Sequence, residues 1–355
     1  MPDLPLNQVL LGDCVELMNA LPEKCVDLVF ADPPYNMQLT GDLMRPDLSH
    51  VDAVTDEWDQ FGSFAEYDAF TRAWLAAARR VMKDTATLWV IGTYHNIHRV
   101  GAILMDLGYW ILNDVVWVKT NPMPQMKGVR FCNAQETLIW AKKSEKATGY
   151  TFRYRDMKSG NEDLQMRSDW YIPLCTGAER ERVNGAKAHS TQKPEALLHR
   201  ILAATTRPGH VVLDPFCGTG TTAAVAKRLD RDFITMDRDP GYVEVARRRI
   251  DAVMPTLLGE EEAPHIDAPK PRVPFVQLVE EGVLPPGTEL RLLKKDVKAI
   301  VNEDGTITVD GVRGSIHRMG ARCLGTSGCN GWEHWLYEES PGHWVCIDAL
   351  RPAAE

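Results

Sequence analysis

The chain has 355 residues, of which 44% are hydrophobic and 25% are charged. This composition is typical of a soluble globular protein, and the length predicts one large domain together with a smaller one. The net charge of −9 argues against a protein that coats nucleic acid indiscriminately, although a local basic surface can still attract a polyanion. No segment reaches the ~20 consecutive apolar residues of a membrane-spanning helix, so no contact with a membrane is expected.

Apolar residues in the first 254 positions alternate between strand-like and helix-like spacing. The predicted order is strand 7–13, helix 14–20, strand 26–31, helix 66–83, strands 87–91, 111–118 and 137–141, helix 194–205, strand 211–214, helix 221–229, strand 232–237 and helix 242–253. Strands that alternate with helices favour a doubly wound α/β fold with a mostly parallel, Rossmann-like sheet. Residues 1–254 are therefore expected to form one domain.

Two segments interrupt this alternation. Residues 36–63 are polar and too long for an ordinary connection, so we expect a mobile functional loop. Residues 142–193 contain eleven Lys or Arg and seven Asp or Glu, a local net charge of +4 in an acidic chain, and also carry aromatic residues. This second segment is the first choice for contact with nucleic acid.

Residues 255–274 are rich in Pro, Glu, Asp and Ala, which predicts a linker. Beyond it, residues 275–355 are expected to form a small mixed domain, with hairpin strands at 297–301 and 306–309 joined by the turn residues 302–305. The eight cysteines include no C-x-x-C pair. They are expected to be reduced thiols in a cytoplasmic protein, without a bound metal.

Two motifs at predicted strand ends carry the chemistry. Asp32 to Tyr35 (D-P-P-Y) follows strand 26–31, and because two prolines cannot continue a central strand, the chain leaves the sheet with a rigid, exposed carbonyl. Residues 214–220 (D-P-F-C-G-T-G) turn between a strand and a helix, where glycines bring the backbone close to a ligand. Ala223 replaces the third glycine of a full G-x-G-x-x-G pattern. Asp237, at the end of the next strand, is placed to bind the ribose hydroxyls of a cofactor.

D-P-P-Y together with F-C-G-T-G resembles the amino-methyltransferases of DNA, and the order of the two motifs is that of their permuted beta group. The likeness covers nearly the whole chain. Residues 189–194 (H-S-T-Q-K-P) look like a segment that precedes the glycine loop in that group, residues 19–24, 89–92, 121–124 and 165–170 resemble the cell-cycle-regulated adenine methyltransferases of alphaproteobacteria, and residues 314–317 and 329–332 resemble the accessory C-terminal module of adenine methylases.

The resemblance implies S-adenosylmethionine as methyl donor, double-stranded DNA as substrate, and N-6 of adenine within GANTC as the target, with 275–355 as an accessory DNA-binding module. The cofactor-binding residues that carry over are Asp13, Asp32, Lys193, Asp214, Phe216, Gly218, Gly220, Thr221 and Asp237. Two positions depart from the family pattern, because Cys217 stands where Phe is frequent and Asp237 stands where Glu is common. At Cys217 the family uses the backbone rather than the side chain, and Asp237 still supplies a carboxylate. Neither departure therefore removes a function.

An exocyclic base amine is a poor nucleophile because its lone pair is delocalised into the ring. The expected catalytic residues are Asp32, Pro33, Pro34 and Tyr35. The base is expected to flip out of the duplex and stack on Tyr35, while Asp32 and the Pro33 carbonyl accept the two amino hydrogens. No covalent enzyme intermediate is needed, and the Pro-Cys pair typical of enzymes that methylate ring carbon does not occur in the sequence.

Residues in four parts of the chain are candidates for DNA contact. They are Leu39, Leu43, Trp58, Arg130, Asn133, Arg153, Arg155, Lys158, Arg167, Arg318, Asn330 and Trp332. The first three would wedge into a distorted or locally strand-separated duplex, while a plain mobile lid is an equal interpretation of 36–63. A solvated basic face is the alternative for the Arg and Lys residues, and a core position is the alternative for the C-terminal tryptophans.

The sequence leaves three alternative functions open. The leading one is site-specific adenine methylation. Methylation of the exocyclic N-4 amine of cytosine uses the same chemistry, but Ser commonly replaces the first Asp in that subgroup, and Asp32 argues against it. The third is a non-catalytic, sequence-specific DNA-binding regulator, which predicts that Asp32→Ala leaves the biological effect intact. A two-fold recognition site makes a homodimer reasonable, in a cytoplasmic protein associated with the nucleoid.

Overall fold

The computed structural model of the chain describes residues 4–37, 57–123, 129–159, 161, 163–254, 273–293, 295–326 and 329–351. The chain divides into two compact units, Met1–Pro264 and His265–Glu355. Most of the predicted loop over 36–63, and most of the predicted linker over 255–274, lie outside the described residues. Among the helices that the structure describes, none combines the length and apolarity needed to cross a membrane.

The first unit is built on a sheet whose strand order, within the described residues, is β1-β10-β9-β2-β3-β5-β4-β6. The strands are β1 (Gln8–Leu11), β2 (Val26–Ala31), β3 (Met82–Gly92), β4 (Trp110–Lys119), β5 (Gln135–Lys142), β6 (Asp169–Ile172), β9 (Val211–Asp214) and β10 (Asp232–Asp237). Neighbouring strands are parallel except where β5 pairs with β3 and β4. The carboxyl ends of β2, β9 and β10 therefore lie at one edge of the sheet.

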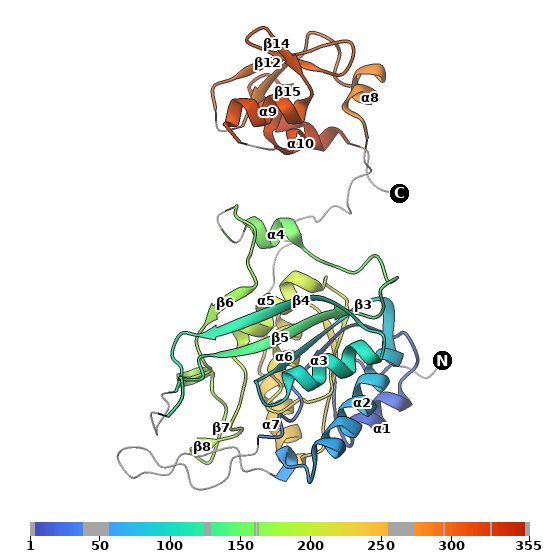
Figure 1. The fold of residues 1–355 in the computed structure, drawn as a ribbon, viewed down its shortest axis with the longest axis vertical. Helices are drawn as coiled ribbons and strands as arrows, with labels where there is room; N and C mark the ends of the chain where they lie inside the picture. Colours follow the sequence, from blue (N-terminus) through green and yellow to red (C-terminus); the bar gives the residue numbers. More distant parts are fainter. Residues whose placement is uncertain are drawn as a thin grey trace. The chain divides into compact units, whose positions relative to one another are not determined.

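Helices cover both faces of this sheet. The helices of one face are α1 (Cys14–Ala20), α2 (Phe64–Val81) and α3 (Ile97–Asp106), which Figure 1 shows grouped together, and those of the other are α5 (Glu195–Thr205), α6 (Thr221–Arg228) and α7 (Pro240–Asp251). In β2, Val29 and Ala31 join the first core while Leu28 and Phe30 join the second, as the two-residue period of a strand requires. The expected doubly wound, mostly parallel α/β fold is confirmed.

Several element boundaries differ from the predicted ones for local reasons. The predicted helix over 66–83 ends at Val81, because Met82 already has extended backbone and begins β3. α7 begins at Pro240 rather than at 242, since the Asp239 side chain accepts hydrogen bonds from the Gly241 and Tyr242 amides and Pro occupies the first helical position. Helix α3 was not predicted at all.

The basic segment over 142–193 has its own regular structure. It contains α4 (Tyr154–Ser159), β6, the 3-10 turn η2 (Gly177–Glu179), and the short hairpin of β7 (Arg182–Val183) and β8 (Ala186–Lys187). Strand β6 extends the large sheet by pairing with β4, and its Trp170 is buried against Trp89. The segment is therefore partly an edge of the sheet and not only a surface insertion.

The second unit is an antiparallel sheet, ordered β14-β13-β12-β11-β15-β16 in the described residues, with short helices. Its elements are α8 (Phe275–Glu280), β11 (Glu289–Leu292), β12 (Lys298–Val301), β13 (Ile307–Val309), β14 (Val312–Gly314), α9 (Ile316–Leu324), α10 (Gly331–His334), β15 (Trp335–Ser340), β16 (His343–Cys346) and η3 (Ile347–Leu350). The predicted hairpin is present as β12 and β13, with Gly305 at a φ of +72° in its turn. Trp332 and Trp335 are buried in the core of this unit.

Candidate active site

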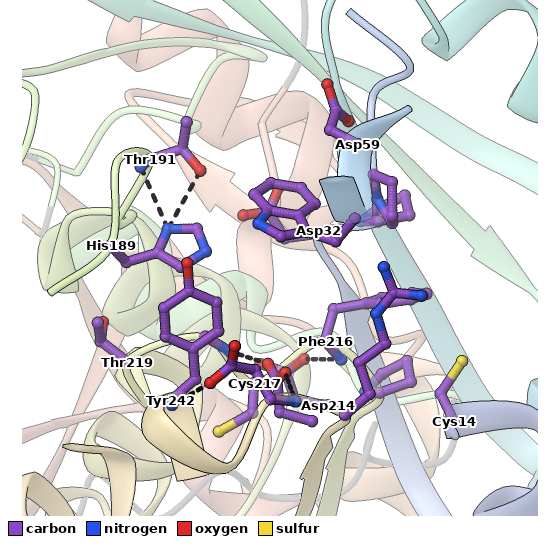
Figure 2. Close-up of a pocket in the computed structure, with 18 of the residues that line it drawn as sticks. Cys14, Asp32, Asp59, His189, Thr191, Asp214, Phe216, Cys217, Thr219 and Tyr242 are labelled. Atoms are coloured by element: carbon purple, nitrogen blue, oxygen red, sulfur yellow. Dashed lines mark hydrogen bonds between the residues drawn. The ribbon is translucent and has the colours of Figure 1, made fainter. Parts of the chain in front are cut away.

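A cavity of about 840 Å³ opens where the loops after β1, β2, β9 and β10 converge. The two motifs that are remote in sequence meet there, as Figure 2 shows, with Asp32 and Phe216 on one side, His189 and Tyr242 on the other, and Asp214 below. The residues of its wall that the sequence analysis named are Asp13, Asp32, Pro33, Pro34, Tyr35, Trp58, Lys193, Asp214, Phe216, Gly218, Thr221 and Asp237.

The glycine turn is tied to the strands on either side of it. The amide of Phe216 donates to Asp214 Oδ1 at 2.9 Å, and the amide of Gly218 donates to Asp237 Oδ2 at 2.9 Å. The other oxygen of Asp237 accepts the Asp239 amide at 2.9 Å. Because each carboxylate oxygen has two lone pairs, Asp237 keeps one acceptor site on each oxygen for a ligand. Gly218 has a φ of +50°, a backbone conformation that favours glycine.

Gly220 does not line the cavity, in contrast to its predicted role at the cofactor. It has a φ of +76° and precedes α6, and a Cβ added to it would lie 2.9 Å from the Ala246 Cβ of α7. The close approach of these two helices therefore explains the glycine. The sequence pattern places Gly220 in the right loop, but this residue packs against α7 and does not line the cavity.

Replacing Gly220 by Ala should lower the free energy of unfolding by more than a left-handed backbone alone explains. The positive φ costs about 1–2 kcal/mol for an L side chain, and displacing Ala246 adds ~1–3 kcal/mol of overpacking. Gly209→Ala is the matched control, because Gly209 has a φ of +75° and none of the described residues places an atom within 4 Å of the added Cβ. Urea unfolding of both variants gives the comparison, and equal losses would contradict the packing argument.

The D-P-P-Y motif leaves β2 through a network of buried charges. Lys193 Nζ lies 2.8 Å from Asp32 Oδ2, and the Tyr35 hydroxyl donates to Asp32 Oδ1 at 2.9 Å. Burial raises the pKa of Asp32, and the nearby Lys193 ammonium opposes that rise. The Tyr35 ring lines the cavity but is only 6% exposed. In this conformation Tyr35 therefore presents its hydroxyl to polar partners and does not offer the open face that base stacking requires.

Two residues that the sequence analysis missed fix the path of this loop. The Asp59 carboxylate accepts the backbone amides of Tyr35, Asn36 and Met37 at 2.5–2.9 Å, and the Tyr67 hydroxyl donates to the Pro34 carbonyl at 2.9 Å. Asp59 is 2% exposed, so these bonds are shielded from water. No local pattern predicts either residue, because their partners lie more than twenty positions away in the chain.

An aromatic wall faces the D-P-P-Y loop across the cavity. Trp58 stacks on His189 at 5.6 Å between ring centroids, and His189 lies 4.7 Å from the Tyr242 ring. Burial, followed by the nearby Lys193 and Arg180, lowers the pKa of His189 to about 4, so the ring is neutral near pH 7. Its Nδ1 accepts the Thr191 amide at 3.1 Å. Trp58, predicted as a DNA contact, thus lies in the wall of the cavity.

The acidic residues give the cavity a negative character. Burial raises the pKa of Asp214 to about 7, although the Thr222 hydroxyl and the Phe216 amide favour its ionised form. Burial also raises the pKa of Asp237. A positively charged ligand group near these carboxylates would favour their ionised forms. The cavity is therefore suited to a ligand that is partly cationic.

The predicted DNA contacts separate into exposed and occupied residues. Arg130, Asn133, Arg155, Arg167, Arg318 and Asn330 are exposed, and Lys158 is half-buried. Arg153 is largely buried and its guanidinium lies 2.5 Å from the Asp156 carboxylate, so the prediction for Arg153 is not supported. Trp332 is 7% exposed because it packs in the C-terminal core, which contradicts its predicted role. Leu39 and Leu43 lie outside the described residues.

Comparison with known proteins shows the family. Residues 26–248 match the family described as DNA methylase, and residues 256–353 match the family described as Restriction Enzyme Adenine Methylase Associated. The chain is 43% identical over 347 residues to the Type II methyltransferase M.HinfI of Haemophilus influenzae, covering 98% of this chain and 96% of the relative. It is 38% identical over 241 residues to the Type II methyltransferase M2.DpnII of Streptococcus pneumoniae, covering 68% and 88%.

Two solved structures share the fold of the first unit. The complex of M1.HpyAVI with S-adenosylmethionine has a TM-score of 0.51 at 23% identity, covering 69% of this chain and 98% of the other. The cytosine-N4-specific PvuII DNA methyltransferase has a TM-score of 0.53 at 20% identity, covering 71% and 88%. At these identities the similarity concerns the fold alone.

The fold, the acidic cavity at its strand ends and the family match over residues 26–248 define a methyltransferase. The chain belongs to the DNA methylase family. It is therefore an enzyme, a DNA methyltransferase.

The residues of the cavity fit S-adenosylmethionine. The cofactor carries a cationic sulfonium and an ammonium group, and Asp32 and Asp214 present carboxylates to the cavity. The acceptor sites left on Asp237 suit ribose hydroxyls, and the Phe216 ring offers an apolar contact for the purine. These groups therefore match each part of the cofactor.

Proposed function

We propose that this protein transfers a methyl group from S-adenosylmethionine to N-6 of adenine in double-stranded DNA, at GANTC sites. The observation that carries the proposal is Asp32, a strand-end carboxylate that borders the same cavity as the glycine turn. The adenine assignment is supported by the match of residues 256–353 to the family described as Restriction Enzyme Adenine Methylase Associated. The GANTC site rests on the resemblance to the cell-cycle-regulated adenine methyltransferases of alphaproteobacteria.

In this proposal the target adenine flips out of the duplex into the cavity beside Asp32, because its amine is out of reach in the stacked helix. The bound cofactor supplies an electrophilic methyl group. Asp32 and the Pro33 carbonyl accept the amine hydrogens, which concentrates the lone pair on nitrogen and positions it for attack. Asp214, Phe216, Gly218 and Asp237 hold the cofactor.

The cysteine in the glycine loop takes no part in this chemistry. Cys217 is 5% exposed, and burial raises the pKa of its thiol well above the ordinary value. A thiol in that state is a poor nucleophile. The proposed transfer is therefore direct, from the donor to the amine.

Substrate engagement is assigned to three surfaces. The exposed residues Arg155 and Arg167 of the 142–193 segment, together with Arg130 and Asn133, are proposed to contact DNA. The C-terminal unit is proposed to be an accessory DNA-binding module that acts through Arg318 and Asn330. A homodimer on a two-fold site, associated with the nucleoid, completes the proposal.

The test uses the purified protein, a labelled methyl donor and duplex oligonucleotides with and without GANTC, digested to nucleosides after reaction. We expect label in N6-methyldeoxyadenosine and only from duplexes that contain the site. A duplex already methylated at both adenines is the control and should accept no label. Label in N4-methyldeoxycytidine would establish the alternative amine target, and no transfer to any duplex would favour a non-catalytic regulator.

A further inference from the structure

A second carboxylate lies behind the D-P-P-Y motif. Glu136 is on β5 and is only 8% exposed, although the other buried residues of that strand are apolar. Its Oε1 lies 2.8 Å from Lys119 Nζ, and its Oε2 lies 3.9 Å from Lys193 Nζ. Two buried ammonium groups therefore neutralise two buried carboxylates, those of Glu136 and Asp32.

The two carboxylates compete for one proton donor. The Tyr35 hydroxyl lies 2.9 Å from Asp32 Oδ1 and 3.1 Å from Glu136 Oε2. A hydroxyl has a single proton, so Tyr35 can donate to only one of them at a time. Rotation of that proton about the C–O bond switches the donor from one carboxylate to the other without moving a heavy atom.

The direction of this hydrogen bond decides what Asp32 can accept. While Tyr35 donates to Asp32 Oδ1, that oxygen is partly occupied and less basic. When Tyr35 donates to Glu136, Asp32 Oδ1 is free, and a protonated Asp32 can itself donate to the Tyr35 oxygen. The chain from Asp32 through Tyr35 to Glu136 then has a donor for every acceptor.

We propose that Glu136 is a positioning residue for methyl transfer, which draws the Tyr35 proton away from Asp32 and so lets Asp32 take the proton released by the substrate amine. This inference rests on the proposed function. As the bond between the amine nitrogen and the methyl carbon forms, the bond between sulfur and that carbon breaks, and its electron pair stays on sulfur. One N–H proton passes to Asp32 Oδ1, and the new O–H points to Tyr35, whose own proton is held by Glu136.

The electrostatics agree with this division of roles. Burial would raise the pKa of Glu136, but Lys193 and Lys119 hold it below the ordinary value. Burial raises the pKa of Asp32, and the negative charge of Glu136 adds to the rise. The proton therefore belongs on Asp32 and not on Glu136. The titratable groups that face the pair are Lys119 of β4, Lys193 before α5, Tyr35 after β2, Asp59 of η1 (Glu57–Asp59) and Asp214 after β9.

The test is Glu136→Gln, which keeps the shape of the side chain but removes its charge. The amide group can donate to the Tyr35 oxygen and leave the Tyr35 proton on Asp32. We expect kcat to fall at least ~10-fold, a modest share of what proton transfer contributes, with cofactor affinity by calorimetry unchanged within about twofold. The acidic limb of the kcat profile should move to lower pH, because Asp32 loses a neighbouring negative charge.

A titration of the cofactor-free protein provides a readout that does not depend on turnover. The infrared carboxyl band that disappears in Asp32→Asn belongs to Asp32, and its dependence on pH gives the pKa of that group. Glu136→Gln should lower this pKa. In a Tyr35→Phe background the same change should lower kcat by less than about twofold, since Glu136 acts through the Tyr35 hydroxyl. The proposal would be overturned if the losses of kcat from Glu136→Gln and Tyr35→Phe multiplied in the double variant. It would also be overturned if Glu136→Gln alone kept the wild-type kcat and the wild-type acidic limb.

Two further variants keep the test decisive. If Glu136→Gln leaves Lys119 unpaired and unfolds the protein, Glu136→Gln with Lys119→Gln replaces the ion pair by two amides. The acidic limb should then move in the same direction by a smaller amount, because the lost Lys119 charge partly offsets the lost Glu136 charge. Asp27→Asn breaks a partly exposed ion pair of the same sheet, in which Asp27 lies 2.8 Å from Lys83, and should cost stability without moving the acidic limb. Failure of the wild-type enzyme to methylate DNA would refute the proposed function. That outcome is distinct from failure of the Glu136 proposal, which concerns differences between the variants and an active wild type.

Discussion

Replacing Asp32 by Asn is expected to lower kcat by at least ~10²–10³-fold, the range for loss of one preorganised electrostatic contact at a reacting centre. The amide keeps the shape of the side chain and one acceptor oxygen, so the 2.8 Å contact with Lys193 can persist and the protein should remain folded. What is lost is the charge that attracts the amine hydrogens and the base that takes the released proton. Single-turnover methylation at saturating cofactor measures the chemical step directly.

A carboxylate elsewhere in the cavity provides the contrast for this variant. Asp237→Asn alters the residue that holds the Gly218 and Asp239 amides and is proposed to bind ribose. Its main effect should be a higher KM for S-adenosylmethionine, with a smaller change in kcat than Asp32→Asn produces. If Asp32→Asn changed KM alone and left single-turnover rates intact, Asp32 would be a binding residue and the proposed chemistry would be wrong.

The fold was predictable where local signals are sharp. Helix α1 and strands β2, β9 and β10 occupy their predicted residues, because Asp13, the two prolines after Asp32 and the glycines after Asp214 mark the ends of apolar runs. Helix α3 lacks such a mark. Its N-cap residue, Asn96, is of a type that often starts helices, but it makes no capping bond to the helix and instead accepts the Thr93 amide.

The proximity of the glycine turn and Asp237 was also predictable, because they belong to consecutive elements of one βαβ unit. The charge network was not. Tyr35 and Glu136 are 101 positions apart, and only the pairing of β5 between β3 and β4 brings Glu136 under the motif. The single local hint is a charged residue among the buried positions of β5, since a buried charge needs a partner.

In the C-terminal unit, a residue that was predicted to contact DNA is buried in the core. Trp332 looked like a DNA contact because it lies in a segment dense in tryptophan and basic residues. In the structure it packs against Phe275 at 5.8 Å between ring centroids, in a small unit whose core depends on large side chains. Composition alone cannot distinguish a stacking surface from the core of a small domain.

Replacing Lys193 by Met should give the largest loss of stability among single changes at the site. The ammonium is 7% exposed and lies between Asp32 and Glu136, 2.8 and 3.9 Å away. It also lies 5.2 Å from the centre of the Tyr35 ring. Met retains the aliphatic packing but leaves Asp32 without its ion-pair partner. Removal of one member of a buried pair costs about 3–5 kcal/mol, and methylation should be lost as well.

The pH dependence of that loss identifies its cause. Without Lys193 the two carboxylates repel each other, and the pKa of Asp32, already raised by burial, rises further. A carboxyl whose pKa is higher in the folded state than in the unfolded state contributes stability that is present at low pH and lost as pH rises through the folded value. The deficit in the free energy of unfolding should therefore be larger at about pH 8 than at about pH 5.

Lys83→Met is the matched control, because the Lys83 side chain is 40% exposed beside Asp27. This substitution should cost only ~1 kcal/mol. Equal deficits in the two variants, or a deficit that does not change with pH, would show that Lys193 contributes by packing and not by neutralising the carboxylates beneath the D-P-P-Y loop.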